Sequence, residues 1–84
     1  MKEIRVLGCY VENRIAEAGE VQGVLTKYGC NIKTRLGLHA VTDESCAVDG
    51  LIVLELCGAA SECDALESAL ASCKGVRLQK MVFG

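Results

Sequence analysis

The chain has 84 residues and a mass of 8.9 kDa, which is enough for one small domain that spans residues 1–84. Hydrophobic residues make up 51% of the chain, aromatic residues only 4%, and the net charge is −2. This composition excludes a disordered chain, which needs low hydrophobicity and high net charge. It also argues against a nucleic-acid-binding module, because the lysines and arginines form no basic tract and few rings are present for base stacking.

Six cysteines in so short a chain raise two alternatives, a disulfide framework or reduced thiols. A framework requires a secreted protein, and residues 1–6 show no apolar signal core followed by a small-residue cleavage site. No apolar run reaches the length of a membrane span. We therefore expect a cytoplasmic protein with reduced cysteines, and a mature secreted fragment is the alternative.

The N-terminal half is expected to form a strand, a helix and a second strand. Residues 3–11 are rich in Ile, Val, Leu and Tyr, which favour strands. Over residues 14–28 apolar side chains recur at helical spacing, with Asn13 as the expected N-cap and Gly29 at the end of the helix. Residues 32–41 alternate in the manner of a strand.

The C-terminal half is expected to form a strand, a helix and a last strand after a polar turn over residues 42–49. Residues 51–57 are a dense apolar run, which is typical of a central strand. Ser61 and Asp64 predict the capping box of a second helix. The apolar stripe of that helix is formed by Leu66, Ala69, Leu70 and Cys73, and the helix is expected to end at Gly75. The last strand is then expected over residues 76–83.

The order of elements is therefore strand, helix, strand, strand, helix, strand. Right-handed crossovers fold this order into an α+β, ferredoxin-like sandwich, in which two helices cover one face of an antiparallel sheet. The expected strand order in the sheet is 4-1-3-2.

One face of this sheet has no helix to cover it, and the alternation of side chains along each strand assigns residues to the two faces. The residues expected to face the helices are Ile4, Val6, Leu36, Leu38, Ile52, Leu54, Leu56, Val76 and Leu78. Those expected on the uncovered face are Arg5, Leu7, Cys9, Val11, Lys33, Arg35, Gly37, His39, Leu51, Val53, Glu55, Cys57, Arg77, Gln79, Met81 and Phe83. So apolar a surface predicts an interface between identical copies, and the alternative is a wrong face assignment on one strand. The residues expected to form this interface or an effector site are Arg5, Arg35, Gly37, Val53, Glu55, Arg77 and Met81.

The same topology is expected to bring Cys9, His39 and Cys46 together at one end of the uncovered face. A neutral imidazole with thiolates suits Zn, Ni or Cu. The alternative is that His39, the only histidine, is an ordinary polar residue of a strand. For Cys63 and Cys73 the expected role is packing, since buried cysteines behave as small hydrophobic residues.

Three stretches of the chain resemble one family, the iron-only hydrogenase system regulators. The stretches are residues 32–37 (Ile-Lys-Thr-Arg-Leu-Gly), 50–56 (Gly-Leu-Ile-Val-Leu-Glu-Leu) and 75–80 (Gly-Val-Arg-Leu-Gln-Lys). This family is similar in fold to the C-terminal, metal-sensing domain of the nickel-responsive transcriptional regulator. The resemblance covers nearly the whole chain and implies an ACT-like ferredoxin fold.

The resemblance also implies a candidate metal site. The nickel regulator binds nickel through a His-x-His on the second strand, a cysteine before the third strand, and a histidine of a neighbouring subunit. His39 matches the second of those histidines and Cys46 the cysteine, with a one-residue slip in the loop, but Gly37 stands where the other histidine would be. The nickel site is therefore incomplete. Arg35 and Gly37 match the hydrogenase-system relatives, and the ribbon-helix-helix DNA-binding segment of the nickel regulator has no counterpart here.

These observations predict a regulatory domain that assembles as a dimer or tetramer, binds a small effector or a transition metal (Ni or Zn), and acts through a partner regulator protein. Direct contact with nucleic acid or membrane is not expected. A purely structural oligomerisation module is the alternative. An enzyme is not expected, because no set of nucleophile, base and orienting group is recognisable. A thiol-dependent activity would rest on Cys9, near Arg5 and His39.

Overall fold

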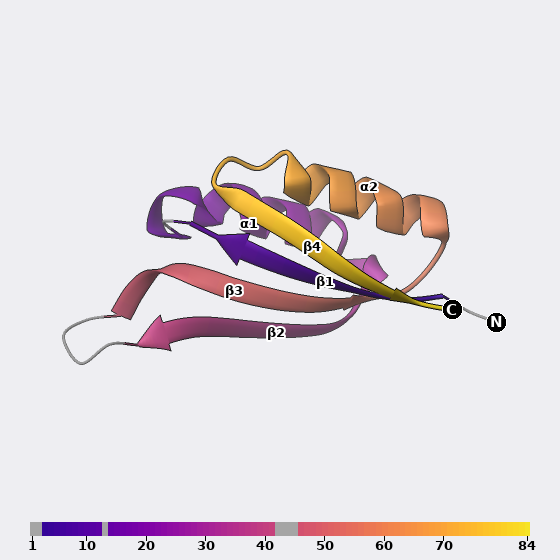
Figure 1. Cartoon of the computed structure of the whole chain (residues 1–84). Coiled ribbons are helices and arrows are strands. Elements are labelled where there is room, and N and C mark those ends of the chain that lie inside the picture. Colours follow the sequence, from indigo (N-terminus) through magenta and orange to yellow (C-terminus); the bar gives the residue numbers. More distant parts are fainter. Residues whose placement is uncertain (1–2, 13, 42–45) are drawn as a thin grey trace.

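The computed structural model describes residues 3–12, 14–41 and 46–84, and it describes side chains outside residues 14–18, 38–41 and 46–49 (Figure 1). The elements in chain order are β1 (Ile4–Val11), α1 (Arg14–Lys27), the 3-10 turn η1 (Gly29–Asn31), β2 (Ile32–Val41), β3 (Cys46–Leu56), α2 (Ala60–Ala71) and β4 (Val76–Phe83). The four strands form one antiparallel sheet in the order β2-β3-β1-β4, which is the predicted 4-1-3-2 order. Both helices lie on the same face of the sheet, so the predicted ferredoxin-like sandwich is confirmed.

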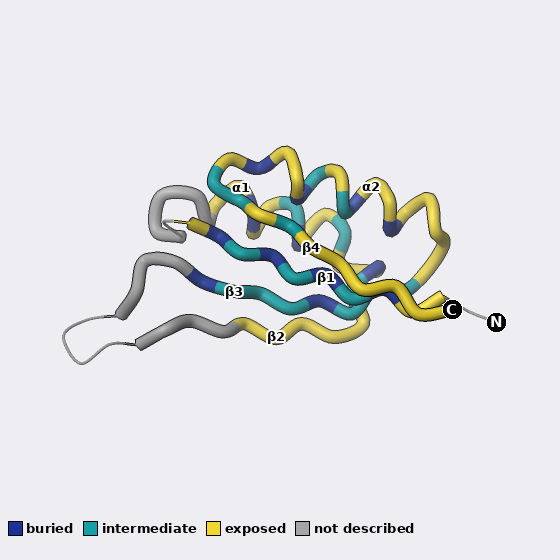
Figure 2. The backbone as a smooth tube through the Cα atoms, viewed as in Figure 1, coloured by how far each residue is buried: buried dark blue, intermediate teal, exposed yellow. Residues whose placement is uncertain are grey.

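The core fills the layer between the sheet and the two helices. Apolar residues four positions apart line one side of each helix, Val21 and Leu25 on α1 and Leu66 and Leu70 on α2. The sheet contributes Leu7, Cys9, Val11, Leu54 and Leu56, and Cys63 and Cys73 complete the buried cluster. Figure 2 shows the resulting alternation of buried and half-buried positions along the two central strands, β1 and β3. The packing role predicted for Cys63 and Cys73 agrees with this placement.

Strand β3 begins at Cys46, five residues earlier than the apolar run at Leu51 suggested. The ladder between β2 and β3 continues to the pair Val41–Cys46, whereas β1 ends opposite Gly50. Pairing with one neighbour therefore extends the strand beyond its hydrophobic stretch, into the segment predicted as a turn. The predicted turn residues 42–45 and the predicted cap Asn13 lie outside the described residues.

Helix α2 begins at Ala60, so the predicted capping box at Ser61 and Asp64 is wrong. The side chain of Glu62 instead accepts a hydrogen bond from the backbone N–H of Ala59, at 3.2 Å. Asp64 instead forms an ion pair with Arg5, which is described below. The same strand-to-helix connection contains Gly58, whose φ of +95° favours glycine.

The face assignment predicted for β1 is wrong. Leu7, Cys9 and Val11 are at most 2% exposed and face the helices, as does Arg5, whereas Ile4 is 47% exposed on the other face. Both faces of this strand are apolar, so alternation alone does not choose between them. Leu7, Cys9 and Val11 fill the core, and Arg5, near the strand's start, reaches acidic side chains of α2.

A β-bulge reverses the faces of β2, so the predicted places of Arg35 and Gly37 on the uncovered face are also wrong. Ile32 pairs with Leu56 and Thr34 with the adjacent residue Glu55, which leaves Lys33 as an extra residue. Beyond the bulge, odd-numbered residues share the helix-covered face. Arg35 accordingly donates a hydrogen bond from Nη2 to Oε1 of Gln22 on α1, at 2.9 Å, and Gly37 lies opposite Ile52.

Candidate functional site

The sheet face that carries no helix is the first candidate site, and we call it the open face. Its residues follow from the strand register and are Ile4, Val6, Tyr10, Thr34, Leu36, Leu51, Val53, Glu55, Arg77, Gln79, Met81 and Phe83. Four of its large apolar side chains are about half exposed: Ile4 47%, Leu36 52%, Met81 58% and Phe83 53%. Four of the predicted interface residues lie on this face, namely Val53, Glu55, Arg77 and Met81.

The charged groups of the open face are held near its two ends by partners of opposite sign. Oε1 of Glu55 accepts a hydrogen bond from the Thr34 hydroxyl at 3.1 Å, and its Oε2 lies 3.7 Å from Nζ of Lys33. Towards the other end, Nε of Arg77 donates to Oε1 of Glu12 at 2.6 Å, and its guanidinium lies 5.4 Å from the centroid of the Tyr10 ring. Between these charged groups lie Leu36, Val53, Gly8 and Gln79, and the apolar pair Ile4 and Phe83 lies at the end of the face beyond Glu55.

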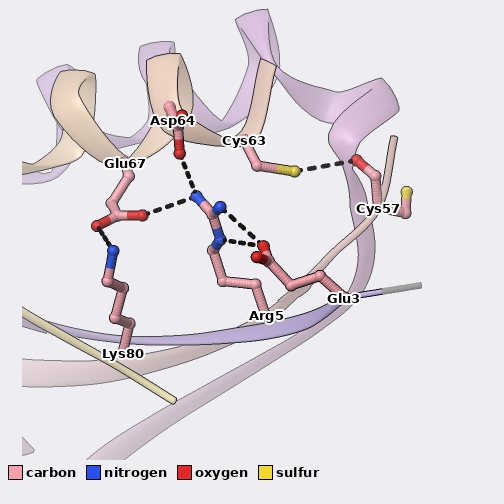
Figure 3. Close-up of polar contacts among 7 residues, drawn as sticks. All are labelled: Glu3, Arg5, Cys57, Cys63, Asp64, Glu67 and Lys80. Atoms are coloured by element: carbon pink, nitrogen blue, oxygen red, sulfur yellow. Dashed lines mark hydrogen bonds and ion pairs between the residues drawn. The ribbon is translucent and has the colours of Figure 1, made fainter. Parts of the chain in front are cut away.

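Arg5 organises a charged cluster between β1 and α2 (Figure 3). Its side chain is only 7% exposed. Nη1 donates to Oδ1 of Asp64 at 2.7 Å and to Oε2 of Glu67 at 3.0 Å. Nε and Nη2 both donate to Oε2 of Glu3, at 2.9 and 2.8 Å, and Lys80 on β4 reaches the other oxygen of Glu67 at 2.9 Å. The hydrogen bonds to Asp64 and then to Glu3 raise the pKa of Arg5 above its ordinary value.

The Arg5 cluster was not predicted from the sequence, which placed Arg5 on the interface. A signal was present, because Asp64 and Glu67 are three residues apart and so share one face of a helix. An arginine in an otherwise apolar strand needs such partners if it turns towards the core. The cluster fixes α2 to the sheet.

Replacing Arg5 by alanine is expected to lower the free energy of unfolding by about 2 kcal/mol, the usual contribution of hydrogen bonds to charged groups. The partly exposed carboxylates of Asp64 and Glu3 can regain water, which limits the loss. Arg5→Met is the matched control, because it keeps the apolar stem and should lose less. Urea unfolding at neutral pH measures both variants, and an Arg5→Met variant as stable as the wild type would show that the charge contributes nothing.

The three residues predicted to hold a metal ion do not come together as expected. Cys9 is 1% exposed in the core, where burial raises the pKa of its thiol. Cys9 pairs with Ile52, six residues along β3 from Cys46, a separation of about 20 Å along the strand. The backbone of His39 lies opposite Gly50 and that of Cys46 opposite Val41, and the side chains of His39 and Cys46 lie outside the described part.

Among the side chains that the structure describes, no group of three or more His, Cys, Asp or Glu is arranged to hold a metal ion. Cys9 therefore does not fit the expected site. A metal ion held by His39 and Cys46 stays a prediction.

A cavity of about 270 Å³ opens beside the Arg5 cluster, where β1 begins and β3 ends. Its lining residues are Glu3, Ile4, Arg5, Lys33, Glu55, Leu56, Cys57, Gly58, Ala60 and Cys63. Ile4 and Glu55 also belong to the open face, so the cavity lies at the edge of that surface. Its lining carries two positive and two negative side chains, which suits a small polar ligand.

No family model matches this chain, and no curated protein matches it. Solved structures do. The uncharacterized protein TM1266 from Thermotoga maritima aligns with a TM-score of 0.80 and 23% identity over 99% of this chain and 100% of that chain. CPII, a nitrogen regulatory PII-like protein from Thiomonas intermedia K12 solved with ADP, AMP and bicarbonate, aligns with a TM-score of 0.56 and 13% identity over 99% of this chain and 94% of that chain.

These likenesses show the fold: the chain has the ferredoxin-like architecture that is also found in PII-like proteins. None of the helices in the described ranges is long and apolar enough to cross a membrane.

Proposed function

We propose that this chain is a small regulatory domain that works as an assembly of identical copies joined through their open faces. The observation that carries the proposal is the exposed apolar surface of the open face, on which Ile4, Leu36, Met81 and Phe83 are about half exposed. An apolar patch of this kind on a small domain marks an interaction site. Burying it would also add to a core that is small in a chain of 84 residues.

A second copy of the chain is the partner that fits this face. Four strands about 4.8 Å apart and some eight residues long make a face of about 500 Å², or about 1,000 Å² for two copies, which is at the lower limit for a biological interface. The charges at its ends are already paired, Glu55 with Lys33 and Arg77 with Glu12. A face that is mostly apolar and whose charges are already paired can meet its own copy without like-charge repulsion.

We further propose that the cavity beside the open face binds a small polar effector. CPII was solved with ADP, AMP and bicarbonate, and this fact belongs to that protein. For this chain the support is the mixed charge of the cavity lining and the two residues, Ile4 and Glu55, that the cavity shares with the open face. A ligand that touches both would bind the assembly and the single copy with different affinity, and so would shift their equilibrium.

The remaining parts of the proposal rest on the sequence. The resemblance to the iron-only hydrogenase system regulators suggests a cytoplasmic regulator that acts through a partner protein and has no catalytic activity of its own. A nickel or zinc ion at His39 and Cys46 belongs to this part of the proposal. Metal analysis of the purified protein, and of His39→Ala and Cys46→Ala, tests it.

Light scattering with and without ADP, AMP, bicarbonate, Ni²⁺ or Zn²⁺ tests the proposed function. We expect a mass that is a multiple of 8.9 kDa and that changes with at least one of these probes. An assembly that responds to none of them would favour a purely structural oligomerisation module. A mass of 8.9 kDa at high concentration would refute the proposal.

A further inference from the structure

Three of the six cysteines lie close together where β3 passes into α2. Cys57 is the first residue after β3, is half-buried, and donates a hydrogen bond from its thiol to the carbonyl oxygen of Cys30, with an S···O distance of 3.5 Å. Cys63, in the first turn of α2, is 5% exposed and donates from its thiol to the carbonyl oxygen of Cys57 at 3.4 Å (Figure 3). All three are free thiols.

The connection brings the Cys63 thiol next to the backbone of Cys57, whose own thiol points away towards Cys30, so a disulfide forms after the Cys57 side chain rotates. A carbonyl oxygen lies about 2.4 Å from its own Cα, so Sγ of Cys63 lies within about 6 Å of the Cα of Cys57. Gly58 holds the turn between them: an added Cβ there would lie 2.7 Å from Nδ2 of Asn31. Both cysteines line the cavity of about 270 Å³ described above, whereas Cys30 does not. The cavity gives the Cys57 side chain room to turn and a small oxidant room to approach.

We propose that Cys57 and Cys63 are a redox-modification site, at which a low-molecular-weight disulfide such as oxidised glutathione converts the two thiols into an intramolecular disulfide. The reaction is thiol–disulfide exchange in two steps. The Cys57 thiolate attacks one sulfur of the oxidant, forms a mixed disulfide and releases one thiolate. Cys63 then attacks Sγ of Cys57 and releases the second thiolate.

The protons lost by Cys57 and Cys63 are taken up by the two thiolates that leave. The protein thiols are oxidised by two electrons, and the oxidant is reduced to two thiols. Reduced glutathione reverses both exchange steps, so the modification is reversible.

The order of the two steps follows from burial. Burial raises the pKa of the Cys63 thiol, so this cysteine is slow to meet an oxidant and acts second. Cys9 and Cys73 are the other buried thiols among the described side chains, and burial raises the pKa of both, so they too react slowly with an oxidant. Burial and the Glu20 carboxylate raise the pKa of Cys73 to about 11. Cys57 is the cysteine of the pair that the solvent reaches.

Disulfide formation would act on the neighbouring cluster. It removes the thiol hydrogen bonds to the carbonyl oxygens of Cys30 and Cys57 and ties the first turn of α2 to the end of β3. Asp64, next to Cys63, holds Arg5, and Arg5 lines the same cavity. Oxidation therefore reshapes a cavity that lies at the edge of the open face.

Digestion after glutamate separates all six cysteines, which makes a sharp test possible. The fragments are residues 4–12 (Cys9), 21–44 (Cys30), 45–55 (Cys46), 56–62 (Cys57), 63–67 (Cys63) and 68–84 (Cys73). The full chain is incubated with oxidised glutathione, remaining thiols are alkylated, and the digest is examined by mass spectrometry without reduction. We expect fragments 56–62 and 63–67 to disappear from the alkylated pool together and to return as one linked pair, which reduction separates.

Two variants serve as controls. Cys30→Ser should leave the linked pair unchanged, because Cys30 offers only its carbonyl to Cys57. Cys57→Ser should abolish the linked pair and leave 63–67 alkylated. A link between fragments 21–44 and 56–62 would assign the disulfide to Cys30 and Cys57 and overturn the proposal. Glutathione bound to Cys57 or Cys30, with no disulfide between fragments 56–62 and 63–67, would also overturn the proposal.

Discussion

Replacing Val53 by glutamate is expected to break the assembly into single copies and leave the fold intact. Val53 lies in the middle of the open face, opposite Gly8 on β1 and Leu36 on β2. In the proposed interface each copy would bury an unpaired carboxylate, at a cost of several kcal/mol per charge. In a single copy the same carboxylate stays in water. Sedimentation velocity should therefore report 8.9 kDa, with an unchanged circular dichroism spectrum.

Thr26→Glu is the matched control for this substitution. Thr26 has the branched shape of valine and is exposed on α1, on the helical side of the molecule. The Thr26→Glu substitution adds the same charge away from the open face, so this variant should keep the mass of the wild-type assembly. If Val53→Glu remained assembled, or if both variants dissociated, the open face would not be the interface.

Leu7→Ala is expected to lower the free energy of unfolding by about 3 kcal/mol, the typical loss for a fully buried leucine. Leu7 is 0% exposed and lies opposite Leu54, which is also 0% exposed. The adjacent Val6 is half-buried on the open face, and Val6→Ala should cost only about 1 kcal/mol. Both are measured by urea unfolding in the Val53→Glu background, so that assembly does not contribute to the difference.

This pair of variants tests the direction of the side chains on β1. A larger loss for Val6→Ala than for Leu7→Ala would mean that Ile4 and Val6 face the helices, as the sequence suggested. Equal losses would mean that the two side chains are similarly buried, which would contradict the orientation of the strand in the structure. The structure predicts that Leu7→Ala lowers the free energy of unfolding by about 2 kcal/mol more than Val6→Ala does.

The fold could be predicted from the sequence because each element carries a local signal. The helices repeat apolar residues every three to four positions, and the strands over residues 32–41 and 76–83 have the bounds that their composition indicated. Gly75, with φ of +76°, marks the turn before the last strand. The sequence of elements then leaves few topologies, and the strand order follows.

The faces of the sheet could not be predicted as well, because they depend on features without a local signal. The bulge at Lys33 reverses the alternation of β2, and nothing in the residues around it marks an extra residue. On β1 both faces are apolar, so the choice depends on whether Arg5 finds acidic partners on a helix 59 residues away in the chain. Because the bulge on β2 and the orientation of β1 were not predicted, Arg5, Cys9, Arg35 and Gly37 were assigned to the wrong face.

The candidate site was predicted only in part for the same reason. Val53 and Met81 lie where expected because β3 over residues 50–56 and β4 over residues 76–83 pair with β1 without a register shift. The convergence of Cys9 with Cys46 failed because Cys9 turns into the core and the ladder of β3 runs past the end of β1. The proximity of Cys57 and Cys63 depends on the tight turn at Gly58, which only the three-dimensional structure shows.

The contact between open faces can be observed directly through the methyl group of Met81. The chain has two methionines, Met1 and Met81, so selective methyl labelling gives a reporter on the open face. In a sample that mixes labelled and unlabelled copies, isotope-filtered NMR detects only contacts between copies. We predict contacts from the Met81 methyl to open-face side chains of another copy, such as Leu36 and Val53. Contacts only to residues of α1 or α2, or no contacts in a sample shown to be assembled, would contradict the proposed interface.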